Sequence, residues 1–319
     1  MIKSNKDFPM QYIDYKRKIE HLPVVATIGF FDGVHLGHRY LIEQVREIAI
    51  QKGLPSAVIT FPVHPRKVMN KEYQPALLCS YEEKVIRLSS TKVDYCISMD
   101  FTRDLSQMTA RDFIHKILKE ELLVDTLIVG YDHRFGHNRK DGFEEYKQYG
   151  AEVGIEVIEA RQYEGEHISA TRIRTLLGDG DVQKAAELLT YHYLLSGKII
   201  EGYKVGRTIG FPTANVESWE RYKVIPAFGV YAVHVYIEGE KHNGMLYIGR
   251  RPTLQNGNNI SVEINIFDFD EDLYGKSVSA EFLEFVRPDE KFPDIDTLRE
   301  QLFKDKRMVQ DLLKMHNCS

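Results

Sequence analysis

Short apolar runs alternate with helical patterns along the first half of the chain. Four runs rich in Val and Ile predict buried strands: 24–30, 55–61, 126–130 and 154–160. Apolar positions recur at helical spacing over 41–50, and Thr109 fits the N-cap of a helix that begins in ARDFIHKIL. Apolar strands separated by helices predict an α/β domain whose parallel sheet is covered on both faces.

The pattern changes near residue 190. A capped helix is predicted over 181–189. After it come five strand patterns separated by Gly, Asn and Asp: 194–202, 228–239, 241–249, 260–270 and 277–286. Strands at this density predict an antiparallel barrel or sandwich.

The tail, 295–315, predicts a terminal helix with a charged, solvated face. Its apolar stripe consists of Leu298, Leu302, Met308, Val309 and Leu312.

The length of 319 residues is enough for two domains, which we expect at 1–185 and 186–319. The longest apolar stretches, 24–31 and 122–130, are too short to span a membrane, and the N-terminus lacks the apolar segment of a secretory signal. The three cysteines, at 79, 96 and 318, show no CxxC spacing, so neither a disulfide framework nor a zinc site is expected. We therefore expect a cytoplasmic protein without a membrane partner.

Charge is nearly balanced in both halves. Residues 1–185 carry 26 Lys and Arg against 27 Asp and Glu, and 186–319 carry 16 against 20, for a net charge of −5. A protein that binds nucleic acid by neutralising many phosphates would show a basic excess. We therefore expect an enzyme that acts on small molecules, with no nucleic-acid partner.

The stretch GFFDGVHLGHRYL, which follows the first predicted strand, combines glycines with two histidines. Gly29 permits a tight turn, and His35 and His38 lie on either side of Gly37 at a helix start. Backbone N–H groups and the positive end of a helix attract oxyanions, and histidines can donate hydrogen bonds to phosphates. Gly37 leaves room for a nucleotide to approach the backbone. Open α/β sheets bind ligands where such strands end, which favours a phosphate site over two ordinary surface or core histidines.

A second cluster, HISATRIRTLL, combines hydroxyls with arginines. Ser169 and Thr171 come just before a predicted short helix that carries Arg172 and Arg174. Hydroxyls at the N-cap and an arginine that reaches back would make an anion site suited to the far phosphates of ATP. The alternative is an ordinary helix start.

Two loops between these clusters, FPVHPRK and VGYDHRFGHNRKDG, are rich in His, Arg and Gly. Both follow predicted strands, and loops at the carboxyl ends of parallel strands line one crevice. The candidates for contact with an acceptor substrate there are Phe61, His64, Asp132 and Arg134. Each residue singly could be structural, but their shared location indicates a binding site.

In the second half, the glycine-rich stretch GYKVGRTIGFPTAN ends on an extended PTAN. Thr213 and Asn215 are two residues apart, so both project to the same side of a strand. A hydroxyl and an amide carbonyl, together with nucleotide phosphates, make a partial Mg²⁺ shell, and the preceding glycines could wrap the phosphates of ATP. The stretch lacks the GK[ST] ending of a Walker A loop.

Glu263 lies on the predicted strand ISVEINIF. Strand alternation places it with Asn265 on the face opposite to Val262, Ile264 and Ile266. A carboxylate there can accept the proton of an attacking hydroxyl, as a kinase base does. The alternative is a solvated strand glutamate.

The motifs of the first half, GFFDGVHLGH, FPVHP, VGYDHRFG and ISATRIR, resemble the adenylyltransferase module of prokaryotic bifunctional riboflavin kinases/FAD synthetases. This module belongs to the HxGH nucleotidyltransferase superfamily. The resemblance implies a Rossmann-like domain that transfers AMP from ATP to FMN and releases pyrophosphate. It implies phosphate contacts for His35, His38, Thr171 and Arg174, and flavin contacts for His64 and Asp132. Relatives often carry a second Ser at Ala170. Because the phosphate of FMN is already ionised, no protein nucleophile is expected.

The motifs of the second half, VGRTIGFPTAN, GVYAV, YIGRRPT, VEINIFDF, LYG and RPDEKF, follow the riboflavin kinase module in order. The resemblance implies a six-stranded antiparallel barrel with a C-terminal helix. It also implies that Thr213 and Asn215 hold Mg-ATP and that Glu263 is the base for the 5′-hydroxyl of riboflavin. Asn265 and Tyr247 stand where His and Asn are frequent in relatives.

Taken over both halves, the resemblance implies a bifunctional enzyme with riboflavin, FMN and ATP as small-molecule partners, Mg²⁺ as cofactor, and FMN and FAD as products. The positions it implies in binding nucleotide or flavin are Gly29, Phe30, Asp32, Gly37, Phe61, His64, Asp132, Ser169, Thr171, Gly206, Arg207, Gly210, Pro212 and Arg287. Two alternatives stay open: an HxGH adenylyltransferase for another phosphorylated acceptor, and a flavin-binding regulator without catalysis. The oligomeric state is open as well.

Overall fold

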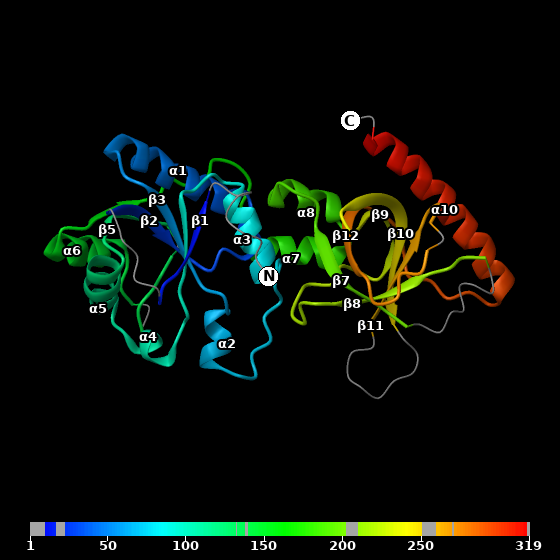
Figure 1. The fold of residues 1–319 in the computed structure, drawn as a ribbon, viewed down its shortest axis with the longest axis horizontal. Coiled ribbons are helices and arrows are strands. Elements are labelled where there is room, and N and C mark those ends of the chain that lie inside the picture. Colours follow the sequence, from blue (N-terminus) through cyan, green and yellow to red (C-terminus); the bar gives the residue numbers. More distant parts are fainter. Residues whose placement is uncertain are drawn as a thin grey trace. The chain divides into compact units, whose positions relative to one another are not determined.

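The computed structural model describes residues 10–16, 23–131, 133–137, 140–201, 210–250, 260–269 and 271–317. The chain forms two compact units, Met1–Ser169 and Ala170–Ser319 (Figure 1). No helix of the described part is both long and apolar enough to cross a lipid bilayer.

The first unit is built on a six-stranded parallel sheet. Its strands are β1 (Gln11–Asp14), β2 (Val24–Ile28), β3 (Ser56–Thr60), β4 (Tyr95–Ser98), β5 (Val124–Val129) and β6 (Glu156–Glu159). They lie in the order β1-β4-β3-β2-β5-β6, and every neighbouring pair is parallel. From β2 the chain first builds outward through β3 and β4, and then on the other side through β5 and β6. Ligands bind where the direction of an open sheet reverses in this way, at the carboxyl ends of the strands.

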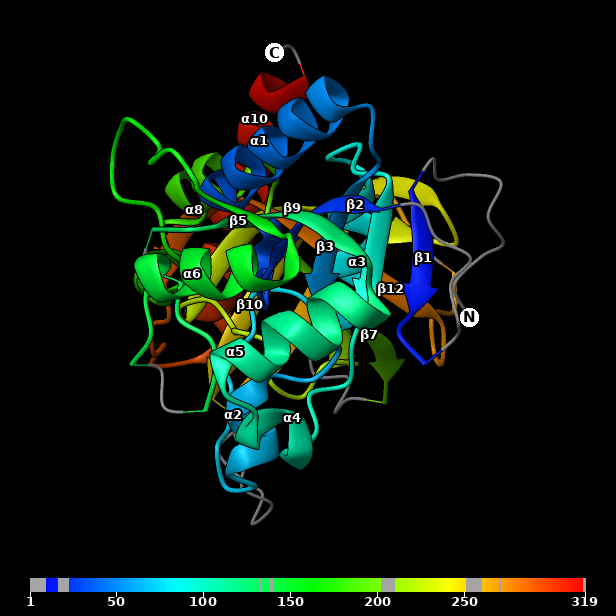
Figure 2. The same cartoon turned by 90° about the vertical axis from the view of Figure 1, so that its left-hand side faces the viewer.

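Helices cover both faces of this sheet. They are η1 (Asp32–Val34), α1 (Leu36–Lys52), α2 (Pro65–Met69), α3 (Tyr81–Ser89), α4 (Arg103–Gln107), α5 (Ala110–Asp112), η2 (Phe113–Glu121) and α6 (Phe143–Val153). α1 and α3 pack on the face that carries Val25 and Val58, whereas η2 and α6 pack on the face that carries Ala26 and Ile59. Figure 2 shows α6 and the α5 segment on the near side of the strands. The predicted parallel α/β architecture is confirmed.

Several features of this unit were not predicted, among them β1, β4 and a change of helix type. β1 and β4 are strands of only four residues each, at the end of the sheet beyond β3. The helix that Thr109 caps, with its Oγ1 3.0 Å from Asp112 N, begins as predicted but continues from Phe113 with the wider hydrogen bonding of a π-helix.

The second unit contains a closed antiparallel barrel. Its strands are β7 (Leu194–Ile200), β8 (Ala214–Ser218), β9 (Gly229–Ile237), β10 (Glu240–Arg250), β11 (Ile260–Ile266) and β12 (Ser277–Pro288). Around the barrel they follow the order β10-β11-β8-β7-β12-β9, with β9 pairing back to β10. All six pairs are antiparallel, which confirms the predicted barrel.

Two short helices precede the barrel and belong to the same unit. α7 (Ala170–Asp179) receives a hydrogen bond at Leu177 O from Ala227 N, at 2.9 Å. α8 (Val182–Leu189) begins at the N-cap Asp181, as the sequence pattern predicts. The compact units therefore divide before α7, while the functional modules at 1–185 and 186–319 stay a prediction.

The terminal helix α10 (Ile295–Asn317) packs on the barrel through Val309 and Leu313, which are buried. The predicted stripe was wrong at Met308, which is 55% exposed, because adjacent helical residues point about 100° apart and Val309 takes the inward direction. The charged face is not uniformly solvated either. Asp305 is 2% exposed and its Oδ2 lies 2.8 Å from Nη2 of Arg287 on β12.

Candidate active sites

The turn that follows β2 has a strained backbone. Phe31 has a φ of 54° and Gly33 a φ of 74°. Such left-handed values cost free energy for a residue with a side chain, so this turn needs support from its surroundings. Asp32 is buried and supplies it, because its Oδ1 accepts hydrogen bonds from the backbone N–H groups of Leu78 (2.9 Å) and Cys79 (3.3 Å). The N–H of Gly33 in turn donates to Cys79 Sγ at 3.1 Å.

His35 and His38 lie together at the N-terminus of α1. Their rings stack with centroids 3.7 Å apart, and His35 Nδ1 accepts a hydrogen bond from the backbone N–H of His38 at 3.4 Å. Because that Nδ1 is an acceptor, a neutral His35 carries its proton on Nε2 and can donate it to an oxyanion. Burial, together with the nearby His35 and Lys84, holds the pKa of His38 well below its usual value. His38 is therefore neutral near pH 7 at a helix N-terminus, where phosphates bind.

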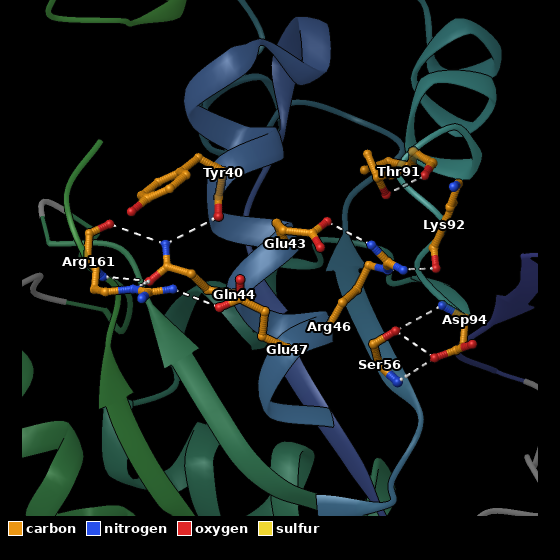
Figure 3. Close-up of polar contacts among 11 residues, drawn as sticks. Tyr40, Glu43, Gln44, Arg46, Glu47, Ser56, Thr91, Lys92, Asp94 and Arg161 are labelled. Atoms are coloured by element: carbon orange, nitrogen blue, oxygen red, sulfur yellow. Dashed lines mark hydrogen bonds and ion pairs between the residues drawn. The ribbon is translucent and has the colours of Figure 1, made fainter. Parts of the chain in front are cut away.

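Polar contacts hold α1, and with it the histidine pair, in place (Figure 3). Gln44 is buried, and its amide donates to Arg161 O (3.2 Å) and accepts from Arg161 N (2.7 Å). Arg161 also pairs with Glu47 at 2.7 Å. On the other side, Arg46 Nε donates to Lys92 O at 3.0 Å. These contacts join α1 to the segments that follow β6 and α3.

The loop after β3 lies next to the turn after β2. The rings of Phe30 and His64 meet edge to face with centroids 4.6 Å apart, and His64 Nδ1 caps α2 by accepting from Arg66 N at 3.1 Å. Phe61 is buried with its ring edge-on to Phe101. The structure thus brings Phe30, Phe61 and His64 to the carboxyl ends of β2 and β3. Their contact with a ligand stays a prediction.

Of the two candidate residues in the loop after β5, the structure describes one. Arg134 lies with its guanidinium beside Gly142, where a Cβ atom would be 3.3 Å from Cζ. Asp132, predicted on the flavin side, lies outside the described residues.

The start of the ISATRIR stretch lies beside the histidine pair. A Cβ atom at Gly37 would be 3.8 Å from Cβ of Ile168. The helix α7 begins at Ala170, a residue of high helix propensity, so Thr171 lies inside the first turn and not before the helix as predicted. This leaves Ser169 as the residue that precedes the helix. Thr171 and Arg174 belong to the second unit, and their role toward the histidines stays a prediction.

One buried cation at this edge of the sheet was not predicted. Lys84 of α3 is 2% exposed, and its ammonium donates to the carbonyl oxygens of Phe30 (2.9 Å) and Phe61 (2.8 Å). Its segment, YEEKVIRLSS, reads as an ordinary amphipathic helix with a capping box, so nothing local marks this lysine as buried.

In the second unit, Glu263 lies in a row that crosses three strands. It pairs in register with Tyr247 of β10 on one side and with Asn215 of β8 on the other. Both oxygens of its carboxylate are held, because Ser261 Oγ donates to Oε1 and Thr213 Oγ1 donates to Oε2, each at 3.0 Å. The structure thus brings Thr213, Asn215 and Glu263 together. Ser261 was not predicted, although its spacing of two from Glu263 places both on one face of β11.

The segment before β8 is held from two sides. Asn265 Nδ2 donates to Pro212 O at 2.7 Å, and the ring of Phe211 lies 4.7 Å from that of Phe303 on α10. Gly210, which precedes them, has a φ of 81°. Gly206, predicted to wrap phosphates, and Arg207, predicted among the binding positions, lie outside the described residues.

A cavity of about 850 Å³ opens beside Thr213. Its lining includes the aromatic residues Phe269 and Tyr274 and the acidic residues Glu271 and Asp272. A volume of this size accommodates a nucleotide. Thr213 therefore contacts the carboxylate of Glu263 and also lines a cavity large enough for a ligand.

Tyr247 is the register partner of Glu263 on the neighbouring strand β10. Its hydroxyl donates to Asp289 Oδ1 at 2.9 Å, and a Cβ atom at Gly249 would be only 2.0 Å from that hydroxyl, so the tyrosine requires glycine there. Burial, with Asp289 and Glu263 nearby, raises the pKa of Tyr247, which keeps the phenol a hydrogen-bond donor.

Arg287, predicted as a flavin contact, is engaged with the terminal helix. Its guanidinium makes hydrogen bonds of 2.8 to 3.0 Å to the carboxylate of Asp305 and stacks over Phe292 at 5.5 Å. Within the described residues, no group of three or more His, Cys, Asp or Glu side chains is arranged to hold a metal ion. A metal at the Thr213 cluster would therefore depend on hydroxyl, amide and nucleotide oxygens.

The first unit is a Rossmann-like sheet with a histidine pair at the carboxyl ends of its strands. The second contains a closed barrel in which Thr213 and Asn215 lie beside Glu263. Together they define a two-domain chain of the nucleotidyltransferase and kinase type. Family models match both parts, FAD synthetase over residues 17–172 and riboflavin kinase over residues 189–313. The chain belongs to the family of bifunctional riboflavin kinases/FMN adenylyltransferases.

Relatives agree over nearly the whole chain. It is 39% identical to the bifunctional riboflavin kinase/FMN adenylyltransferase of Haemophilus influenzae, covering 88% of this chain and 91% of the relative, and 36% identical to that of Listeria monocytogenes, covering 89% and 90%. A solved structure described as a macrolide-efflux protein from Streptococcus pneumoniae superimposes with a TM-score of 0.83 at 30% identity, covering 94% of this chain and 98% of that one.

Proposed function

We propose that the second unit phosphorylates riboflavin to FMN and that the first transfers the adenylyl group of a second ATP to FMN, giving FAD. The observation that carries this proposal is that each half matches its own family model and holds its own cluster of suitable side chains, His35 with His38 and Thr213 with Glu263.

In the phosphorylation step, Glu263 accepts the proton of the 5′-hydroxyl of riboflavin while that oxygen attacks the γ-phosphorus and ADP leaves. The hydrogen bonds from Ser261 and Thr213 fix the orientation of the carboxylate before substrate binds. The cavity beside Thr213 receives the nucleotide.

Mg²⁺ fits the second unit by the chemistry of its donors. Thr213 and Asn215 offer neutral oxygens beside the carboxylate of Glu263, and Mg²⁺ prefers few protein oxygens with water and phosphate completing its shell. Bound Mg²⁺ would neutralise charge on the phosphates of ATP.

In the adenylyl-transfer step, a phosphate oxygen of FMN attacks the α-phosphorus of ATP and pyrophosphate leaves. His35 and His38 donate hydrogen bonds to the phosphate oxygens as charge develops, with help from the N-terminus of α1. His64 with Phe61 orients the flavin. No side chain forms a covalent intermediate.

The partners in this proposal are riboflavin, FMN and ATP, without nucleic acid or membrane. We place the enzyme in the cytoplasm, where ATP is made and where the buried free thiols Cys79 and Cys96 stay reduced.

Chromatography of flavin products tests the proposal. The purified chain given riboflavin, ATP and Mg²⁺ should form FMN and then FAD. The absence of any phosphorylated flavin would remove the kinase function. FMN that accumulates without FAD, even when FMN is supplied directly, would remove the adenylyltransferase function. Screening pantetheine phosphate and nicotinamide mononucleotide as acceptors separates this proposal from an adenylyltransferase of other specificity.

A further inference from the structure

Lys84 is a charged group in an apolar interior. The residue is 2% exposed, and burial lowers its pKa to about 8, although Cys79, Asp32 and Cys96 act in the opposite direction. A lysine is rarely buried this fully unless its ammonium has specific partners. The described contacts show what those partners are.

The ammonium joins two neighbouring strand ends. It donates to Phe30 O at 2.9 Å, just after β2, and to Phe61 O at 2.8 Å, just after β3. Phe30 O also accepts from Thr60 Oγ1 at 3.2 Å. Carbonyls at the carboxyl ends of parallel strands no longer have a partner strand, so a cation that binds two of them fixes the points from which both loops depart.

The same lysine also positions a side chain. Its Nζ lies 4.0 Å from the ring centroid of Phe30, within the range of a cation–π contact. The same ring also meets that of His64 edge to face, with centroids 4.6 Å apart. A continuous series of contacts therefore runs from Lys84 through Phe30 to His64.

We propose that Lys84 is a positioning residue for adenylyl transfer: by tying the start of the histidine loop to the start of the acceptor loop, it sets the distance between the ATP phosphates and FMN. It binds two backbone carbonyls and the ring of Phe30, so it acts through residues that we propose to meet the substrates. The inference rests on the adenylyl transfer proposed above and adds a residue on α3 to it.

The first test compares Lys84→Met with the unchanged chain. Methionine keeps the length of the stem and removes both hydrogen bonds. Because a displacement of about 1 Å in reacting groups costs roughly 100-fold in rate, we expect kcat for FMN adenylylation to fall about 100-fold, with the Kd of ATP changed by less than about threefold. Riboflavin phosphorylation, measured on the same sample, should be unchanged.

Lys52→Met is the matched control. Lys52 also ties strands together through its ammonium, which lies 2.8 Å from Asp125 of β5 and 2.7 Å from Glu156 of β6, but at the amino ends of those strands. It should lower the thermal stability of the first unit and leave the kinetics of adenylylation unchanged. Equal kinetic losses in both variants would show a general effect of stability and overturn the proposal.

The pH profile separates positioning from packing. The charged form of Lys84 makes the stronger contacts, so adenylylation by the unchanged chain should decline as pH rises through about 8. The other groups that face the ammonium are Asp32, Cys79, Cys96, Tyr81 and His38. Burial raises the pKa of each of the two thiols to about 12 and also raises that of Tyr81, while the pKa of His38 lies below 6.5, so these four do not titrate near pH 8.

The alkaline decline should disappear in Lys84→Met. If that variant does not fold, Thr60→Val serves in its place, because it removes one hydrogen bond to Phe30 O and should lower kcat by about three- to tenfold. Wild-type kcat in folded Lys84→Met, or in Thr60→Val if the first variant does not fold, would overturn the inference. So would the absence of an alkaline decline in the unchanged chain. If the unchanged chain makes no FAD from FMN, the proposed function itself fails.

Discussion

Replacing Asp305 with asparagine tests how the terminal helix is attached to the barrel. The carboxylate of Asp305 accepts from Nε and Nη2 of Arg287 and from Nε2 of Gln301, at 2.8 to 3.0 Å, and is 2% exposed. Removing one partner of a buried ion pair typically costs about 3–5 kcal/mol, because the other charge is left without compensation. The side chain of Arg287 is 16% exposed and keeps its bond to Pro288 O, so the lower end, about 3 kcal/mol, applies.

Calorimetry of the full chain provides the measurement. For a unit of this size, about 3 kcal/mol lowers the Tm of the corresponding transition by roughly 10 °C. A double-mutant cycle with Arg287→Met should show that the second substitution adds little once the first is present, because both remove the same pair. A decrease below about 1 kcal/mol for Asp305→Asn would refute the reasoning.

The same variants decide the role of Arg287. If the guanidinium acts by holding α10, Arg287→Met and Asp305→Asn should change the KM of riboflavin to a similar extent. A large increase in KM confined to Arg287→Met would instead support the flavin contact that the sequence predicts.

Three further predictions concern the two sites. Glu263→Gln should reduce FMN formation by about 10³-fold and leave conversion of supplied FMN to FAD within twofold, with Glu281→Gln, on β12, as a control that leaves both reactions unchanged. In the folded state the pKa of His38 is lowered, so below about pH 6.5 the unfolded chain binds a proton at His38 that the folded chain does not. The free energy of unfolding of the first unit should therefore fall by up to about 1.4 kcal/mol for each pH unit below that point. His38→Gln should remove this dependence in denaturant titrations at several pH values. Tyr247→Phe removes the hydrogen bond to Asp289 and should raise the KM of riboflavin by about two- to tenfold with no effect on adenylylation; an unchanged KM would show that this contact does not shape the acceptor site.

The features of the two sites whose residues lie within one short stretch of sequence could be predicted. The histidine pair, the PTAN segment and the strand bearing Glu263 each occupy one short stretch whose spacing fixes its geometry. Lys84 and Asp305 could not be predicted, because each looks like an ordinary charged residue on a helix. Their burial depends on partners far away in sequence, namely the carbonyls of Phe30 and Phe61 and the guanidinium of Arg287.

The edge strands of the first unit, β1 and β6, affect how readily copies of the protein associate at high concentration. β1 and β6 close the two sides of the sheet, each is only four residues long, and β6 carries a glutamate at both ends, Glu156 and Glu159. A neighbouring molecule that added a strand there would gain few hydrogen bonds and would bring its own carboxylates against these two. The described strands of the barrel form a closed ring, so none of them is an edge strand. Crowded copies of the folded protein therefore have little opportunity to associate by sheet extension.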